Sequence, residues 1–135
     1  MPPTSPTTSI VRAGFNADMQ PVPVKGNPNI TKIVHHENFQ GGYLVGLSVA
    51  THAAGEECGK HNHRGAVEQF FVLEGFGVIT IDGVEHKVQP GDSVLVPVGA
   101  THNVTAAPFA PFAVQCMLVI APGHEDDPTP WAPTS

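Results

Sequence analysis

The amino-acid sequence predicts an all-β fold in which antiparallel strands form a sandwich or a barrel. Gly and Pro occur 14 times each in 135 residues, whereas only 13 % of the residues are charged, and this composition favours turns and strands over long salt-bridged helices. No window shows a sustained helical period. Turn signals instead recur at short, regular spacing, as an all-β sandwich or barrel requires. With 41 % hydrophobic residues, the chain is long enough for a single domain with its own core.

Residues 1–29 are predicted to form an extended N-terminal arm. Its first nine residues are almost all Pro, Thr and Ser, and they offer little to bury. Pro21, Pro23 and Pro28 then interrupt any helix. We expect this arm to cover the barrel or a partner subunit.

The barrel domain is predicted over residues 30–121. It begins with a strand at 30–35, and Gly41-Gly42 turns the chain into a second strand at 43–50. The strongest hairpin signal is Asp82-Gly83, because a type I′ turn needs positive φ at two successive residues. Further strands are expected at 68–73, 78–81, 84–88, 93–96 and 112–120.

Residues 122–135 are predicted to form a Pro-rich, acidic C-terminal tail. Four prolines and the run Glu125-Asp126-Asp127 favour a surface strap over a further strand. Trp131 is the single tryptophan of the chain. It either anchors this strap to the barrel or to a second subunit, or is a partly exposed side chain.

Three histidines and one glutamate are spaced so that they can meet at one ion. His61 and His63 lie two positions apart, so in an extended backbone both imidazoles leave the same face. Glu68 opens the strand at 68–73, and His102 follows the strand at 93–96. Neutral imidazoles and a carboxylate make a mixed N/O set, which suits a divalent transition metal and leaves part of an octahedron free.

The spacing of these residues resembles the two motifs of the cupin superfamily. The first motif is matched at Gly55, His61, His63, Glu68 and Gly75, and the second at Gly91, Pro97, Gly99 and His102. One position departs from the pattern, because the Asn that usually ends the second motif is Ala106 here. The resemblance covers residues 55–106 and implies a small single-domain cupin, an antiparallel jelly-roll barrel or double-stranded β-helix. It also implies that His61, His63, Glu68 and His102 are the metal ligands.

The expected cofactor is one divalent transition metal, and His and carboxylate ligands suit Fe, Mn, Ni, Cu, Co and Zn alike. Glu68 is the single candidate for a catalytic residue, because it could act as a base if it left the metal. On the same strand face, Phe70 and Val72 are expected to line the substrate pocket. The opposite face, with Phe71 and Leu73, then needs cover from a second sheet or a partner chain.

The remaining histidines receive structural interpretations. His52 is expected at the surface or in a hydrogen bond, and His86 and His124 are expected to be solvated. His35-His36 point to opposite faces of an extended chain, so both cannot bind one ion.

Other polar side chains are likewise not assigned to the chemistry. Cys58 and Cys116 are expected to be free thiols, with Cys58 a small loop residue rather than a soft ligand. Gln69 and Gln115 are candidates for orienting a substrate, and structural roles are favoured for both. Tyr43 is far from both motifs, which argues against a role as a catalytic phenol.

Charge and targeting signals exclude several classes of partner. The net charge of −6, with only two arginines, argues against a nucleic-acid or anionic-membrane partner. Residues 1–6 lack the features of a secretory signal, and the longest apolar segment, 112–121, is too short to span a bilayer. We therefore expect a cytoplasmic protein that binds a small molecule and forms a homodimer.

Three functions are compatible with this pattern. The first hypothesis is a metal-dependent dioxygenase or other oxygenase that acts on a small, mostly apolar chelating substrate such as a diketone, an enediol or a phenolic compound. The second is a non-oxidative metal enzyme, an isomerase, cyclase, decarboxylase or lyase. The third is a non-catalytic module that binds a small ligand or only the metal.

Overall fold

The structure, a computed structural model, describes residues 30–33 and 43–134, and these residues form eight β-strands and no helix. The strands are β1 (Ile30–Ile33), β2 (Leu44–His52), β3 (Ala66–Glu74), β4 (Gly77–Ile81), β5 (Val84–Val88), β6 (Ser93–Val96), β7 (His102–Ala106) and β8 (Phe112–Ile120). The described residues therefore offer no helix long and apolar enough to cross a membrane. The predicted arm at 1–29, the His35-His36 pair and the Gly41-Gly42 turn lie outside the described residues.

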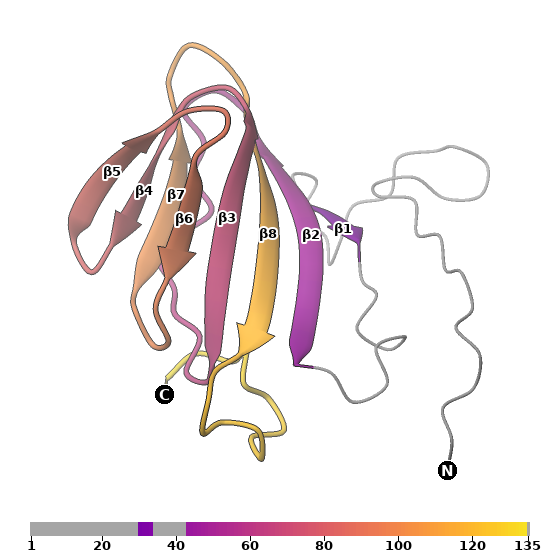
Figure 1. Ribbon diagram of the computed structural model, residues 1–135. Helices are drawn as coiled ribbons and strands as arrows, with labels where there is room; N and C mark the ends of the chain where they lie inside the picture. Colours follow the sequence, from indigo (N-terminus) through magenta and orange to yellow (C-terminus); the bar gives the residue numbers. More distant parts are fainter. Residues whose placement is uncertain (1–29, 34–42, 135) are drawn as a thin grey trace, which may run out of the picture.

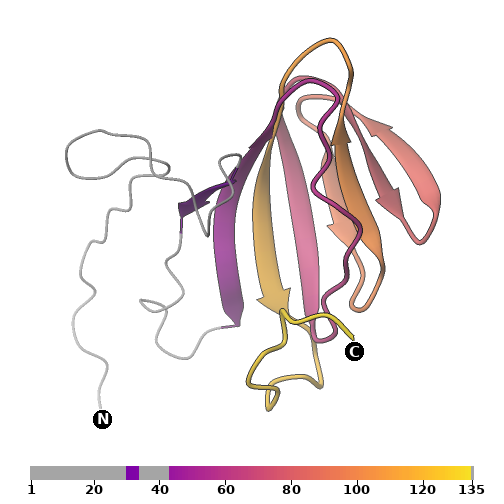
Figure 2. The ribbon, with the colours of Figure 1, turned by 180° about the vertical axis from the view of Figure 1, so that it is seen from behind.

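The strands form two antiparallel sheets that face each other (Figures 1 and 2). One sheet has the order β1-β2-β8-β3-β6, and the other has the order β5-β4-β7. The segment before β3 runs alongside β7 and is joined to it by bridges between Glu57 and Thr105 and between His61 and His102. The fold is the predicted all-β jelly roll, and this extra segment brings the ligand loop onto the smaller sheet.

The core lies between the two sheets and follows the predicted alternation of β3. Phe70 and Val72 are 4 % and 1 % exposed, whereas Phe71 and Leu73, which point outward, are 38 % and 47 % exposed. Side chains from both sheets complete the core: Ala50, Ile79, Val88, Val96, Ala100, Val104, Ala106, Phe112 and Val114. The period-2 pattern thus fixes which face of β3, and hence Glu68, turns toward the interior.

The hairpin between β4 and β5 has the predicted turn. Asp82 has φ of 47° and Gly83 has φ of 82°, so both central residues adopt the left-handed conformation that a type I′ turn needs. The carboxylate of Asp82 also accepts a hydrogen bond from the backbone N–H of Thr101 at 2.9 Å. This contact ties the hairpin to the residue that precedes His102.

Several expectations for polar residues need correction. His52 is the last residue of β2 and is only 3 % exposed, so it does not lie at the surface. Its Nδ1 atom also has no hydrogen-bond partner. His124 is half-buried against Gly65 rather than solvated, whereas His86 is exposed as predicted. Gln69 donates to the hydroxyl of Ser93 at 2.9 Å on the outer face of the larger sheet, which is a structural role.

Candidate metal centre

The four predicted ligands meet at one place between the two sheets. His61 and His63 lie on the segment before β3, Glu68 lies on β3, and His102 is the first residue of β7. One ligand atom from each of the four residues lies within 4.8 Å of the other three. Metal bonds of about 2.0–2.2 Å place neighbouring ligand atoms about 3 Å apart and opposite ones about 4 Å apart, so small side-chain movements would bring the four atoms around a single ion.

Backbone hydrogen bonds hold the two motifs together beneath these side chains. His61 and His102 are paired, with N–H to O distances of 3.0 and 2.8 Å. The amide of Gly99 donates to the carbonyl of His63 at 2.9 Å. The amide side chain of Asn103 accepts from Gly59 N–H at 3.0 Å and donates to Glu57, so it fastens the loop to β7. The imidazoles are therefore positioned by main-chain geometry and not by the ion alone.

The Nδ1 atom of each imidazole lies against a backbone carbonyl. His61 Nδ1 is 2.8 Å from Gly59 O, and His102 Nδ1 is 3.0 Å from Ala100 O. His63 Nδ1 is 2.6 Å from the carbonyl of Trp131 in the C-terminal segment. A carbonyl only accepts, so Nδ1 carries the proton in the neutral form of each ring, and Nε2 is then the atom that would bind a metal. Without a metal, His102 Nε2 faces the Glu68 carboxylate instead.

The carboxylate of Glu68 faces the Nε2 atoms of two imidazoles. It lies 2.9 Å from His102 Nε2 and 3.5 Å from His63 Nε2. Burial of Glu68 raises its pKa, but the contacts with His102 and His63 outweigh it and lower the pKa to about 2. Glu68 is therefore an anion at neutral pH and provides the negative charge that a dication requires.

The His63 ring gives the most direct test of whether these residues fit a metal. Its Nε2 atom is buried and has no hydrogen-bond partner, because the 3.5 Å separation from Glu68 is too long for one. Buried polar atoms of this kind are uncommon unless an ion or ligand completes them. The donor set thus fits a divalent transition metal.

Burial and local charge shift the pKa values of the two histidines of the loop, His61 and His63, in opposite directions. Burial lowers the pKa of His61 most, and the nearby His102 and His63 lower it further against the opposing Gly59 carbonyl. Burial also acts to lower the pKa of His63, but Glu68 and the Trp131 carbonyl outweigh it and the pKa is raised. A proton on His63 is consequently the main competitor of a metal at this ring.

Apolar side chains surround the centre on its inner side. The ring of Phe70 packs edge-on against His102, with 6.0 Å between the ring centroids, and Val72 is buried further along β3. A role for these two residues in substrate binding stays a prediction.

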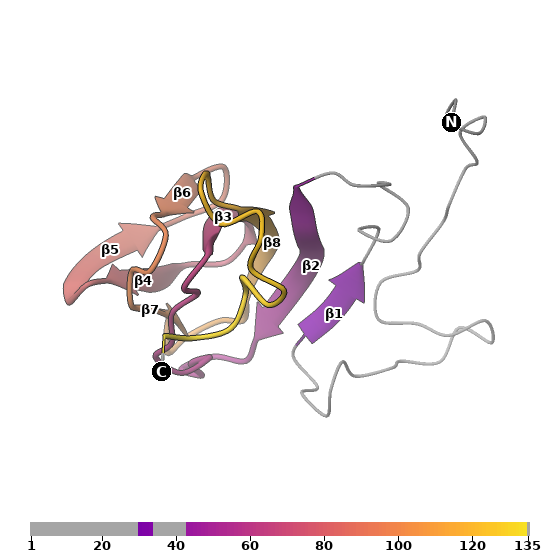
Figure 3. The same ribbon diagram turned by 90° about the horizontal axis from the view of Figure 1, so that it is seen from below.

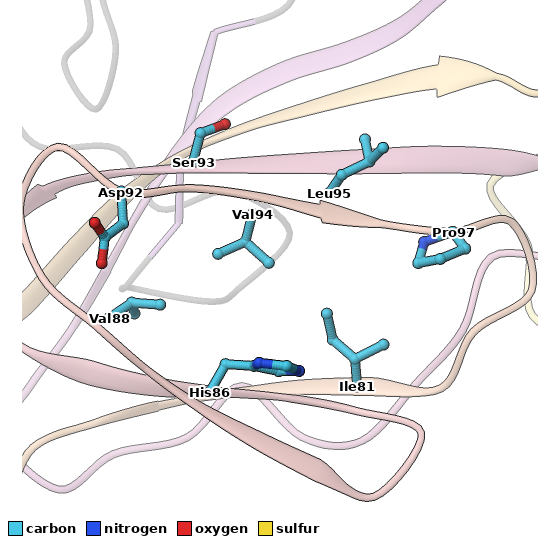
Figure 4. A pocket seen from close by; sticks show the side chains of 8 residues that line it. All are labelled: Ile81, His86, Val88, Asp92, Ser93, Val94, Leu95 and Pro97. Carbon is cyan, nitrogen blue, oxygen red and sulfur yellow. The ribbon is translucent and has the colours of Figure 1, made fainter.

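A groove of about 560 Å³ lies between β5 and β6, which are edge strands of the two sheets. Its lining consists of Ile81, His86, Val88, Asp92, Ser93, Val94, Leu95 and Pro97. Figure 4 shows the side chains of Ile81 and Val94 pointing into this space, whereas those of Ser93 and Leu95 point away. Ile81 is the register partner of His102, so the groove reaches the strand pair that carries one of the four ligands.

The two cysteines are unpaired, as predicted. Cys58 accepts a hydrogen bond from Val104 N–H at 3.3 Å, which fits the interpretation as a loop residue. Burial raises the pKa of the Cys116 thiol, which therefore stays protonated. Neither cysteine belongs to the group of four ligand residues.

The contribution of the C-terminal segment was not apparent from the sequence. Residues 122–134, coloured yellow in Figure 3, cross beneath the sandwich and pair with the ligand loop. Trp131 itself is 46 % exposed, and it is the carbonyl and not the indole that contacts the centre. No sequence signal marks such a contact, because every residue has a carbonyl.

The fold and the four converging side chains define a jelly-roll protein with a candidate metal centre, and the family comparison agrees. The cupin domain model matches residues 48–121, more than half of the chain. The protein therefore belongs to the cupin family.

Its relatives include an uncharacterized protein of Methanocaldococcus jannaschii, which is 25 % identical over 120 residues covering 89 % of this chain and 94 % of that protein. The dimethylsulfoniopropionate lyase DddW of Ruegeria pomeroyi is 36 % identical over 62 residues, which cover 46 % of this chain and 40 % of the lyase.

Solved structures of similar fold include a cupin protein from Bacteroides fragilis. It has a TM-score of 0.61 at 25 % identity and covers 77 % of this chain and 86 % of that chain. A predicted oxalate decarboxylase from Thermotoga maritima has a TM-score of 0.63 at 18 % identity, with 67 % and 78 % of the two chains covered. The second likeness shows the fold alone.

Proposed function

We propose that the protein is an enzyme that depends on one divalent transition metal, held by His61, His63, Glu68 and His102, and that acts on a small chelating organic molecule. The observation that carries this proposal is the convergence of the four ligand atoms within 4.8 Å, with a buried His63 Nε2 that has no partner. When bound, the metal supplies Lewis-acid activation and a template for two reactants.

The side chains around the centre support a substrate with an apolar body and an anionic head. Three neutral imidazoles and one carboxylate leave a dication with a residual positive charge, which favours an enediolate, a phenolate or a diketone enolate. Phe70, which is 4 % exposed, packs against His102 and makes that side of the centre apolar. Between β5 and β6, the groove lined by Ile81 and Val94 offers further apolar surface.

The reaction that we propose first is the addition of dioxygen to such a substrate. Among the described residues, Glu68 is the one carboxylate in the ligand group, and it already faces two imidazoles. The ligand group contains no acid–base pair apart from the metal ligands themselves. Such a site suits a reaction in which the metal ion brings the two reactants together. The expected residue roles are therefore binding for the three histidines, and charge balance for Glu68.

Oxygen consumption tests this reaction. Protein stripped of metal is reconstituted separately with Fe, Mn, Ni, Cu, Co and Zn, and each form is mixed with diketone, enediol and phenolic substrates in an oxygen-electrode cell. We expect uptake with at least one metal, and none with a His102→Ala variant treated identically. Absence of uptake with every metal and substrate class contradicts the oxygenase proposal.

A non-oxidative lyase is the second candidate, and the similarity to the lyase DddW over 62 residues favours it. In that case Glu68 would take the proton from the carbon next to the substrate carboxylate, a C=C bond would form, and the bond from the β-carbon to the leaving group would break with both electrons going to that group. The three histidines would hold the ion, which would supply Lewis-acid activation. Turnover of dimethylsulfoniopropionate or a related acid under argon distinguishes this candidate from the oxygenase. Metal binding without turnover in either assay identifies a binding module instead.

A further inference from the structure

We propose that the C-terminal strap, residues 122–134, is a positioning element of the metal centre and that Asp127 holds it in place. This inference rests on the proposed metal site. The cupin domain model matches residues 48–121, so the strap follows the matched region in the sequence. The inference gives this segment a role in the metal site.

His63 depends on this strap in a way that the other two histidines do not. The rings of His61 and His102 are held by carbonyls two residues away in the sequence, whereas the carbonyl that holds His63 lies 68 residues away, at Trp131. The orientation of His63, and the direction of its Nε2, is therefore set by where the strap lies.

An ion pair and a short backbone ladder dock the strap on the residues that follow His63. The Arg64 guanidinium donates from Nε and Nη2 to the two carboxylate oxygens of Asp127, both at 2.8 Å, and Nη2 also lies 2.6 Å from the Thr129 hydroxyl. The amides of Arg64 and Gly65 donate to the carbonyls of Ala132 and Pro130, both at 2.9 Å. A two-point guanidinium–carboxylate contact fixes distance and angle together.

Two more contacts show that the strap and the ligand loop fit closely. A Cβ atom placed on Gly65 would lie 3.0 Å from Pro130 Cβ and 3.1 Å from His124 Nδ1, so a larger residue here would require the strap to move by a few tenths of an ångström. The Asn62 side chain accepts from Thr134 N–H at 2.8 Å. Asn62, Arg64 and Gly65, which flank His63, thus all contact the strap.

The first test is a cobalt(II) titration of the full chain, with binding followed by visible absorption. Asp127→Asn removes the ion pair, and Asp126→Asn, an equal change of charge at the exposed neighbour, is the matched control. We expect Asp127→Asn to weaken binding roughly 10-fold, as loss of outer-shell support does, and to change the ligand-field spectrum. Asp126→Asn should leave both unchanged. Arg64→Ala and the double variant Arg64→Ala/Asp127→Asn are measured as well. The double variant should bind cobalt no more weakly than the weaker-binding of the two single variants, because both substitutions remove the contact between Arg64 and Asp127.

A second test needs no metal. Exchange of the Arg64 and Gly65 amides should accelerate in Asp127→Asn, and nitrogen NMR should show His63 changing from the Nδ1–H form to a mixture of tautomers. Unchanged amide exchange would overturn the role of Asp127. Faster exchange with an unchanged His63 tautomer, cobalt affinity and spectrum would overturn the role of the strap. If the wild type binds no cobalt, the proposed function fails, and the tautomer of His63 alone decides the inference.

Discussion

Replacing Glu68 by Gln removes the buried charge of the centre while keeping the size of the side chain. In the metal-free protein, the contacts with His102 and His63 hold the pKa of Glu68 at about 2, against an ordinary value of 4.5. At about 1.4 kcal/mol per pH unit, this difference corresponds to about 3 kcal/mol of folding stability. The Glu68 side chain is only 12 % exposed, so solvent screens this contribution little. The amide of Gln still accepts a hydrogen bond, which makes the figure an upper limit.

The sign of the effect follows from the direction of the pKa change. Because the carboxyl is more acidic in the folded protein than in the unfolded chain, its stabilisation is fully present above pH 4.5 and is lost as the pH falls toward about 2. Urea unfolding of chelator-treated wild type and Glu68→Gln at pH 7, 4 and 2.5 measures it. We expect the variant to be less stable by up to about 3 kcal/mol at pH 7 and the gap to close toward pH 2. A gap that stays constant with pH would refute the proposed interaction of Glu68 with the two imidazoles.

Three further outcomes are expected elsewhere in the fold. Burial lowers the pKa of His52, so the unfolded chain binds more protons and the wild type should lose stability as the pH falls below 6.5. Urea unfolding at pH 8 and pH 5 should show that His52→Leu loses less stability between the two pH values than the wild type does. An equal loss in both proteins would show that His52 is not the cause. Gly77→Ala should lower the free energy of unfolding by about 1–3 kcal/mol, because its new Cβ would lie 2.7 Å from a ring carbon of Phe112. Gly46→Ala is the control, because a Cβ there would meet nothing within 4 Å. Equal urea midpoints for the two variants would contradict the close packing at Gly77. We expect two copies of the chain to form a dimer through the outer face with Phe71 and Leu95. Replacing both residues by lysine should therefore halve the mass measured by light scattering. A wild type that is already monomeric would contradict this expectation.

The inner face of β3 and the hairpin turn could be predicted because local chemistry decides them. Alternation places Glu68, Phe70 and Val72 on one side of a pleated strand, whatever the rest of the chain does. Asp82-Gly83 tolerates positive φ twice, and few other pairs do. The resemblance to the two cupin motifs implied the four ligand residues, and their ligand atoms do lie close together.

Contacts between distant segments could not be predicted in the same way. The carbonyl of Trp131 lies against His63 in a strap that also pairs Asp127 with Arg64, 63 residues away in the sequence. A carbonyl has no signature in a sequence. The strand β7 was not predicted, because the adjacent polar residues His102 and Asn103 interrupt the alternation that marks a half-buried strand.

Burial of His52 escaped prediction because its position at the end of β2 suggests solvent. The residue lies opposite Phe112, which is fully buried. Burial at a strand end depends on which neighbours cover it, and those neighbours come from other parts of the chain.

Anomalous diffraction from crystals of metal-loaded protein, recorded on both sides of the absorption edge of the metal, tests the central claim most directly. We predict one peak per chain, at about 2.0–2.2 Å from the Nε2 atoms of His61, His63 and His102 and from a carboxylate oxygen of Glu68. A peak bound elsewhere, or no peak in crystals grown with excess metal, would contradict the account.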